Sequence, residues 1–171
     1  MRFRLLLLAT AALAAACTIP ASEPSSPAPS PARGRSGLGA TESRIFDLIN
    51  AERRRQGLRV LAYNPDLDRM AKIQAQNMAH FQKMAHVLPE SSLPTLRDRA
   101  RYVGYPFGRL AENVAFGFPN PETAVDGWMR SKGHRTNILD GDVEETGIGI
   151  VRSPGGGLYY CQVFGRHLRS L

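Results

Sequence analysis

Apolar residues recur at the spacing of an α-helix in four stretches of the chain. Thr41 or Ser43 can cap the first helix, and Gly57 supplies its end. Two further helices begin near Pro65 and Pro121, because proline suits a first helical turn whose backbone N–H has no partner. The expected helices cover residues 41–56, 64–81, 93–103 and 121–133.

Strand signals come late in the chain, as short runs rich in β-branched and aromatic residues. The expected strands cover residues 113–118, 147–152 and 158–164. Between the last two strands, the segment Pro154-Gly155-Gly156-Gly157 predicts a hairpin turn. Helices first and antiparallel strands afterwards indicate an α+β fold.

The first residues form a targeting segment. Arg2 and Arg4 precede a 12-residue apolar run that only Thr10 interrupts, which predicts a secretory signal peptide over residues 1–16. The run is too short to span a bilayer. It ends in L-A-A-A-C, which resembles the lipobox of bacterial lipoproteins, where the chain is cut before a cysteine that carries diacylglycerol. We therefore expect a lipid anchor at Cys17, with a secreted protein cut nearby as the alternative.

A tether follows the cysteine. Residues 18–40 contain prolines and serines and almost no large apolar side chain, so they cannot bury a core. The expected organisation is a signal peptide over 1–16, a lipidated cysteine and tether over 17–40, and one folded domain over 41–171.

The positive charge of the chain does not indicate a nucleic-acid partner. The formal charge is +7 for the whole chain, and removal of Arg2 and Arg4 with the signal peptide lowers it to +5. The densest basic run, residues 53–55, falls where the first helix ends. Cations there complement the helix dipole, and we expect all three arginines to be solvated.

Three separate stretches carry side chains suited to chemistry. They are M-A-H at His86, A-E-N at Glu112 and W-M-R-S-K-G-H-R-T-N-I-L around His134. A local H-E-x-x-H metal motif, a glycine-rich phosphate loop and a G-x-S-x-G elbow are all missing from the sequence. The fold must therefore gather these residues if they form one site.

These stretches, followed by G-I-G-I and Y-Y-C-Q-V-F-G, resemble the CAP superfamily over residues 42–166. The superfamily includes cysteine-rich secretory proteins, insect venom antigens and plant pathogenesis-related proteins, and this chain is similar to its short bacterial extracytoplasmic branch. The resemblance implies a three-layer α-β-α sandwich with a central antiparallel sheet and a cleft on one face.

The resemblance also implies site residues. His86 and His134 match the two cleft histidines through which several members bind zinc or another divalent ion, and Glu112 matches the acid of the family's G-E-N motif. Ser131 stands where larger eukaryotic members carry a second acid. Asn137 resembles the asparagine that follows the second histidine.

The chemistry of this group leaves several roles open. Two neutral imidazoles and one carboxylate are suitable Zn²⁺ ligands, and a fourth position left to water can lower the pKa of that water toward about 7. Glu112 can instead orient a histidine from outside the ligand shell, or act as a base. A purely structural alternative is that Glu112 accepts backbone N–H bonds and His134 holds the turn after its helix.

The other residues that the motifs contain are assigned to the cleft or the core. Asn113 and Asn137 are expected beside the cleft, where Asn137 bonds loop backbone. Ser131 lies three residues before His134, but no oxyanion-hole signature supports it as a nucleophile. The expected core residues include Trp128, Phe164 and Cys161, the last as a free thiol.

Two functions follow from these interpretations. The first is a lipid-anchored extracytoplasmic binding module whose cleft takes a divalent metal, a small or lipid-like molecule or a cell-envelope ligand. The second is a metal-assisted hydrolase of an envelope substrate, with His86 and His134 as metal ligands and Glu112 as base. In a Gram-negative cell, Thr18 after the lipidated cysteine is compatible with the outer membrane or the periplasmic face.

Overall fold

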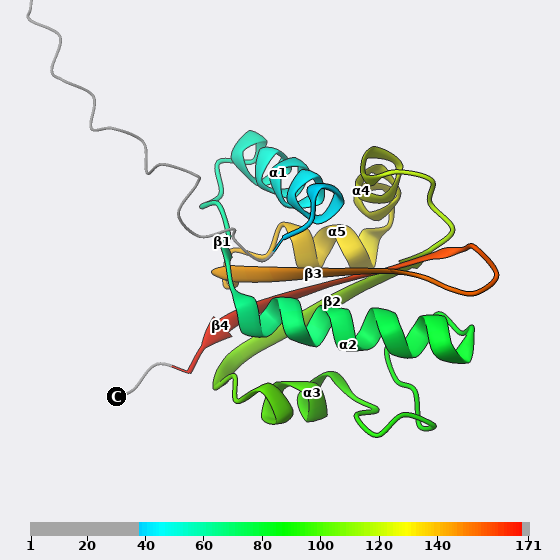
Figure 1. Ribbon diagram of the computed structural model, residues 1–171. Coiled ribbons are helices and arrows are strands. Elements are labelled where there is room, and N and C mark those ends of the chain that lie inside the picture. The colour runs from blue at the N-terminus through cyan, green and yellow to red at the C-terminus, as the bar shows by residue number, and fades with distance from the viewer. Residues whose placement is uncertain (1–37, 169–171) are drawn as a thin grey trace, which may run out of the picture. The chain divides into compact units, whose positions relative to one another are not determined.

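Within residues 38–168, which the computed structural model describes, four strands form one sheet (Figure 1). The strand order is β1-β3-β4-β2, and the bounds are Ala62–Tyr63 for β1, Phe107–Phe116 for β2, Glu145–Arg152 for β3 and Leu158–His167 for β4. β4 pairs antiparallel with both β3 and β2. The expected signal peptide, Cys17 and most of the expected tether lie outside the described residues.

Helices cover both faces of this sheet (Figure 1). On one face lie α2 and α3, and on the other lie α1, α4 and α5. Their bounds are Ala40–Arg55 for α1, Pro65–Phe81 for α2, Leu96–Val103 for α3, Pro121–Arg130 for α4 and Lys132–Ile138 for α5. The expected three-layer α-β-α sandwich is confirmed. None of the helices within the described range has the length and apolar run that a membrane crossing needs.

Strand β4 is buried on both of its faces. Tyr160 and Phe164 pack with Trp128 in the core under α1 and α4, whereas Cys161 and Val163 pack in the core under α2. Successive side chains of a strand point to opposite faces, so a strand between two helical layers needs apolar residues at consecutive positions. The expected burial of Trp128, Phe164 and Cys161 is confirmed.

Two glycines of β3 allow α2 to contact the sheet backbone directly. Gly147 and Gly149 face α2, while Ile148 between them points into the opposite core. A methyl group on Gly147 would overlap the backbone of Asp68, and one on Gly149 would overlap the backbone of Ala71. The G-I-G-I segment thus fixes the distance between α2 and the sheet.

The element boundaries follow local backbone chemistry. Asn64 caps α2, because its Oδ1 accepts the Asp66 N–H at 2.9 Å and the Leu67 N–H at 3.1 Å. The predicted side-chain cap of the first helix is wrong, since Gly39 precedes α1 without such a bond. The last two strands and the turn over residues 154–157 are confirmed, with Ser153 N–H donating to the Gly157 carbonyl at 2.8 Å.

Three features of the sheet and helices depart from the sequence-based prediction. The strand expected over 113–118 is β2, which covers Phe107–Phe116 and so begins six residues earlier. The sheet is not wholly antiparallel, because the two-residue β1 runs parallel to β3. The expected helix over 121–133 ends at Arg130, because the backbone of Ser131 is extended (φ −84°, ψ 120°) and α5 begins at Lys132. Because of this break, the residues of α5 do not continue the helical face of α4.

Arg53 also departs from expectation. Arg54 and Arg55 are exposed at the end of α1, but Arg53 is only 1% exposed. Its guanidinium donates to the carbonyls of Arg59, Ile138 and Asp140 at 2.7–2.8 Å. A buried cation needs such partners, and here it holds the loop after α5 against α1.

The glycine contact with α2 gives a stability prediction. Gly149→Ala places a methyl group against helix backbone, so we expect the free energy of unfolding to fall by about 1–3 kcal/mol or more. Gly133→Ala is the matched control, since a side chain there meets nothing within 4 Å and alanine favours a helix. Urea unfolding of both variants measures the difference, and equal stabilities would contradict the close contact.

Candidate functional site

The centre of the candidate site is a hydrogen bond between His86 and Glu112. Glu112 lies in the middle of β2 with 3% of its side chain exposed, whereas His86 lies in the loop after α2 with 55% of its side chain exposed. The His86 Nδ1 and the Glu112 Oε1 are 3.0 Å apart. Since a carboxylate accepts, Nδ1 carries the proton and Nε2 is the ring nitrogen left for another partner.

A fully buried arginine holds the other carboxylate oxygen. Arg99, from α3, donates to Glu112 Oε2 through Nη2 and to Gln74 Oε1 through Nη1. The Gln74 amide in turn donates to the Ala85 carbonyl at 2.6 Å. The same network therefore orients the carboxylate and anchors the loop that carries His86.

Sequence reasoning missed Arg99 as part of the site. The signal that identifies it is helical spacing, because Leu96, Arg99, Ala100 and Val103 follow the i, i+3, i+4, i+7 pattern of a buried face. An arginine at such a position must find buried partners.

Cys161 completes the surroundings of the carboxylate. Its Sγ lies 3.4 Å from Glu112 Oε2, and the thiol is free and buried, as expected. Burial, followed by the charge of Glu112, raises the pKa of this thiol well above its ordinary value. Cys161 is therefore a neutral S–H that donates weakly to the carboxylate.

Side-chain amides fasten α5 to the open edge of β2. Asn137 donates to the Glu112 carbonyl at 3.2 Å and to Asn113 Oδ1 at 2.9 Å, and Asn113 donates to the His134 carbonyl at 3.1 Å. Farther along the same edge, the indole N–H of Trp128 donates to the Val114 carbonyl at 3.4 Å. The Asn137 amide thus bonds to backbone, as expected, but this backbone belongs to a strand and not to a loop.

The fold brings the residues predicted from sequence to one pocket. A hollow of about 580 Å³ is lined by His86, Glu112, Ser131, His134 and Asn137, with Lys132, Gly133 and Thr136. Asn113 does not line this pocket. It follows Glu112 in β2, so its side chain lies on the opposite face of the strand from the Glu112 carboxylate. Of the other histidines, His80 contacts Phe81 and His167 lies 3.3 Å from a Glu145 carboxylate oxygen, so neither lines this pocket.

The three central side chains are unequal as metal ligands. Within residues 38–168, no group of three or more histidine, cysteine, aspartate or glutamate side chains is arranged to hold a metal ion. Both oxygens of Glu112 already accept bonds from His86, Arg99 and Cys161. Of the roles left open by the sequence, these contacts favour Glu112 as the group that orients His86.

The Ser131 hydroxyl has no triad geometry in the part of the chain that the structure describes. Ser131 joins α4 to α5 in an extended conformation, so it does not share a helical face with His134. No hydrogen bond joins the two side chains among the described residues, and the contacts do not favour a serine nucleophile.

The two imidazoles differ in protonation. The hydrogen bond to Glu112 raises the pKa of His86 above 6.5, with burial opposing the shift. Burial lowers the pKa of His134 below 6.5, and the nearby charge of His86 lowers it further. His134 is therefore the more readily available neutral ligand, and His86 is the better anchored ring.

The fold and the pocket define a family. The model of the CAP cysteine-rich secretory protein family matches residues 46–164. The chain belongs to this family.

Similar proteins come from several bacteria. The chain is 34% identical over 131 residues to the Bacillus subtilis protein YkwD, covering 77% of this chain and 49% of that protein. An extracellular SCP-domain protein from Bacillus anthracis superposes with a TM-score of 0.68 at 30% identity, over 74% of this chain and 40% of that one. An outer surface protein of Borrelia burgdorferi gives the same TM-score at 19% identity, over 74% and 92%. The chain thus spans about half or less of the first two relatives.

The hydrogen bond between His86 and Glu112 predicts an order of titration. In an NMR titration of the full chain, we expect His86 to titrate above pH 6.5 and His134 below it. Glu112→Gln should lower the pKa of His86, because burial and the charge of Arg99 then dominate. A wild-type His134 that titrates above His86 would contradict this arrangement.

The raised pKa of His86 also determines how the stability of the fold depends on pH. Protonated His86 is favoured in the folded state, so its contribution is complete below pH 6.5 and is lost as the pH rises through the raised pKa.

Proposed function

We propose that this CAP-domain protein is an extracytoplasmic binding module that holds a divalent metal ion through His86 and His134. Zn²⁺ is the ion that we propose before any other. The observation that carries the proposal is the buried Arg99–Glu112 pair that orients His86 toward a pocket shared with His134. A metal-ligating histidine commonly donates its second ring N–H to a carboxylate, which fixes the ring and its tautomer.

The donor set fits such an ion. His86 keeps Nε2 available, and the lowered pKa of His134 keeps that ring neutral at the pH where a metal competes with protons. Imidazole nitrogen is a preferred Zn²⁺ ligand, and two protein ligands leave coordination positions for a ligand in the pocket. A bound Zn²⁺ supplies Lewis acidity to whatever oxygen or nitrogen group enters there.

An apolar hollow beside the histidines supports a small or lipid-like ligand. It measures about 300 Å³, shares Ser131 and His134 with the two-histidine pocket, and is lined by Met84, Val114, Ala115, Phe116, Phe118, Gly127 and Trp128. Met84 and Phe116 are 53% and 49% exposed, so this hollow offers apolar surface that solvent reaches. A ligand with a polar head and an apolar tail would use both hollows.

The alternative function, a metal-assisted hydrolase with Glu112 as base, is less well supported by these contacts. A general base needs a carboxylate oxygen within reach of the proton that it removes. Both oxygens of Glu112 carry partners, and the side chain is only 3% exposed. We therefore propose binding as the function of the site.

The location belongs to the same proposal. The signal-like segment over residues 1–16 and the lipobox-like sequence that ends at Cys17 support export and a lipid anchor. The similar Bacillus anthracis protein is described as extracellular, which supports an extracytoplasmic place for this domain as well.

Metal titration of the full-length chain tests the site. His86→Ala and His134→Ala should each weaken Zn²⁺ binding by at least about tenfold, because each removes one protein ligand, and Glu112→Gln should weaken it by about 10–100-fold through loss of orientation. His80→Ala, an exposed histidine outside the pocket, is the matched control. Calorimetry measures the affinities, and thermal melts verify that every variant folds. Affinity that neither His86→Ala nor His134→Ala reduces would refute the site.

Membrane anchoring has a separate test. Cys17→Ala should move the protein from the membrane fraction of the expressing cell to the soluble exported fraction, because the acylated thiol is lost. Cys161→Ala is the control, since that thiol is buried inside the domain. Labelled fatty acid should enter the wild type and the Cys161 variant but not the Cys17 variant. Retention of Cys17→Ala in the membrane would contradict the anchor.

A further inference from the structure

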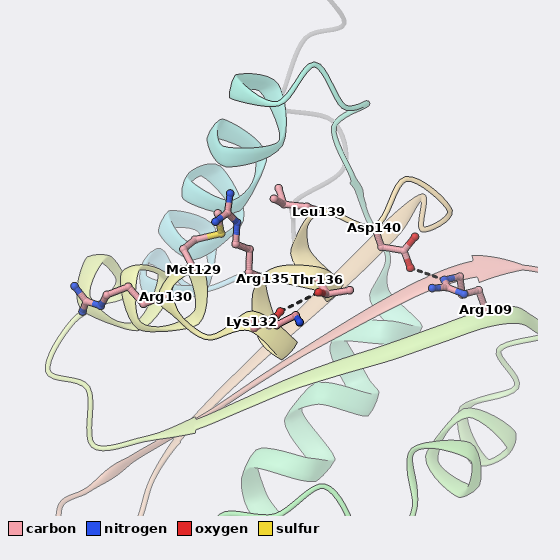
Figure 2. Close-up of a pocket in the computed structure, with 8 residues that line it drawn as sticks. All are labelled: Arg109, Met129, Arg130, Lys132, Arg135, Thr136, Leu139 and Asp140. Carbon is pink, nitrogen blue, oxygen red and sulfur yellow. Dashed lines mark hydrogen bonds and ion pairs between the residues drawn. The ribbon is translucent and has the colours of Figure 1, made fainter.

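A basic pocket adjoins the two-histidine pocket between α4, α5 and the edge strand β2. Figure 2 shows its lining residues, which are Arg109, Met129, Arg130, Lys132, Arg135, Thr136, Leu139 and Asp140. Its volume is about 480 Å³, within the range of small-molecule sites. Lys132 and Thr136 line both pockets, so the two hollows are neighbours with different chemistry.

The cations of this pocket come from three elements. Arg109 belongs to β2, Arg130 to α4, and Lys132 and Arg135 to α5. Arg130 is paired with Asp126 at 2.6 Å and points away from the other three in Figure 2. Lys132 and Arg135 are exposed and form no ion pair with any described residue. Lys132 and Arg135 therefore remain unpaired in this part of the chain, and Arg109 has its ion pair with Asp140.

The acidic residue of the lining does not balance these charges. Asp140 is 10% exposed, and its Oδ1 accepts the Asp142 N–H at 2.8 Å while its Oδ2 accepts from Arg109 Nε. The charge of the carboxylate also acts on the buried Arg53, which donates to the Asp140 carbonyl. Asp140 thus has two cationic neighbours of its own.

Asp140 also positions Arg109 for a ligand. The bond uses Nε, so Nη1 and Nη2 of Arg109 have no hydrogen-bond partner among residues 38–168. A guanidinium held in this way presents a fixed pair of donors, which matches the geometry of an oxyanion.

The local excess of positive charge does not simply follow from the composition. Residues 38–168 contain 17 lysines and arginines against 14 aspartates and glutamates, which is close to balance. Many of the other cations are paired, as in the exposed Arg44–Glu122 bridge at 2.7 Å. In the basic pocket, by contrast, Lys132 and Arg135 are unpaired within the described range and line the same hollow as Arg109.

We propose that this basic pocket binds the phosphate group of an organic phosphate ester. A phosphate offers several acceptor oxygens and up to two charges, which suit the Nη1 and Nη2 donors of Arg109, while Lys132 and Arg135 add positive charge along the same pocket. Met129 and Leu139 supply apolar contact for the organic part. The inference is independent of the metal proposal, because it uses none of the residues assigned to hold that ion.

The test uses the full-length chain and two sources of the same chemistry. Glycerol 1-phosphate, measured by calorimetry, represents a soluble ester, and vesicles of phosphatidylglycerol in phosphatidylcholine, measured by co-sedimentation, represent a lipid headgroup. Vesicles of phosphatidylcholine alone are the blank. For the vesicle arm, the Cys17→Ala chain removes any contribution of an acyl anchor.

The double variant Lys132→Gln/Arg135→Gln should lose at least about tenfold in affinity for the probe that binds, because two charge-assisted contacts are removed. Arg54→Gln/Arg101→Gln removes the same charge from exposed sites outside this pocket and should change the affinity less than about twofold. Thermal melts verify that both variants fold.

Each outcome decides the proposal. Binding of glycerol 1-phosphate that depends on Lys132 and Arg135 supports it with a soluble ester as the source, and dependence seen with phosphatidylglycerol vesicles alone supports it with a lipid headgroup. No binding of either probe, or equal loss in both double variants, overturns it. His86→Ala, which lies outside the basic pocket, should leave the affinity for the probe that binds at the wild-type value, so failure here is distinct from failure of the metal site.

Discussion

A buried ion pair between Arg99 and Glu112 fixes the candidate site. Both side chains are almost fully removed from water, so each depends on the other to offset the free energy of desolvation. Loss of one partner from such a pair costs about 3–5 kcal/mol, because the remaining charge stays buried. The pair joins α3 to the sheet, and through Gln74 it also ties down the loop that carries His86. Buried groups that solvent does not reach therefore fix the position of the exposed His86 ring.

Side chains on the two faces of β2 position different histidines of the pocket. The Glu112 carboxylate lies on the α2 side, where it meets Arg99, Cys161 and His86, and the neighbouring Asn113 lies on the α5 side, where it fixes the backbone of His134. Adjacent residues of one strand thus position the two histidines from opposite layers of the sandwich. This explains how side chains from a loop and a helix on different faces reach the same hollow.

Much of the fold could be predicted from the sequence, because helical spacing, the Asn64 cap and the glycine-rich turn are local signals. The prediction failed at short irregular segments and where the deciding contact was not local. The break at Ser131 is a single extended residue inside a helical pattern, and β1 is only two residues long. Arg53 resembles its exposed neighbours in sequence, yet carbonyls from distant segments bury it. The convergence of His86 and Glu112, 26 residues apart, came from family resemblance and not from any local pattern.

The amide and indole bonds along β2 have a consequence beyond the pocket. An edge strand with free carbonyl groups is a template onto which a strand of another molecule can add. Here the carbonyls of Glu112 and Val114 already accept bonds from Asn137 and Trp128. Side chains of the same polypeptide thus shield this stretch of the sheet edge from the addition of a strand of another molecule.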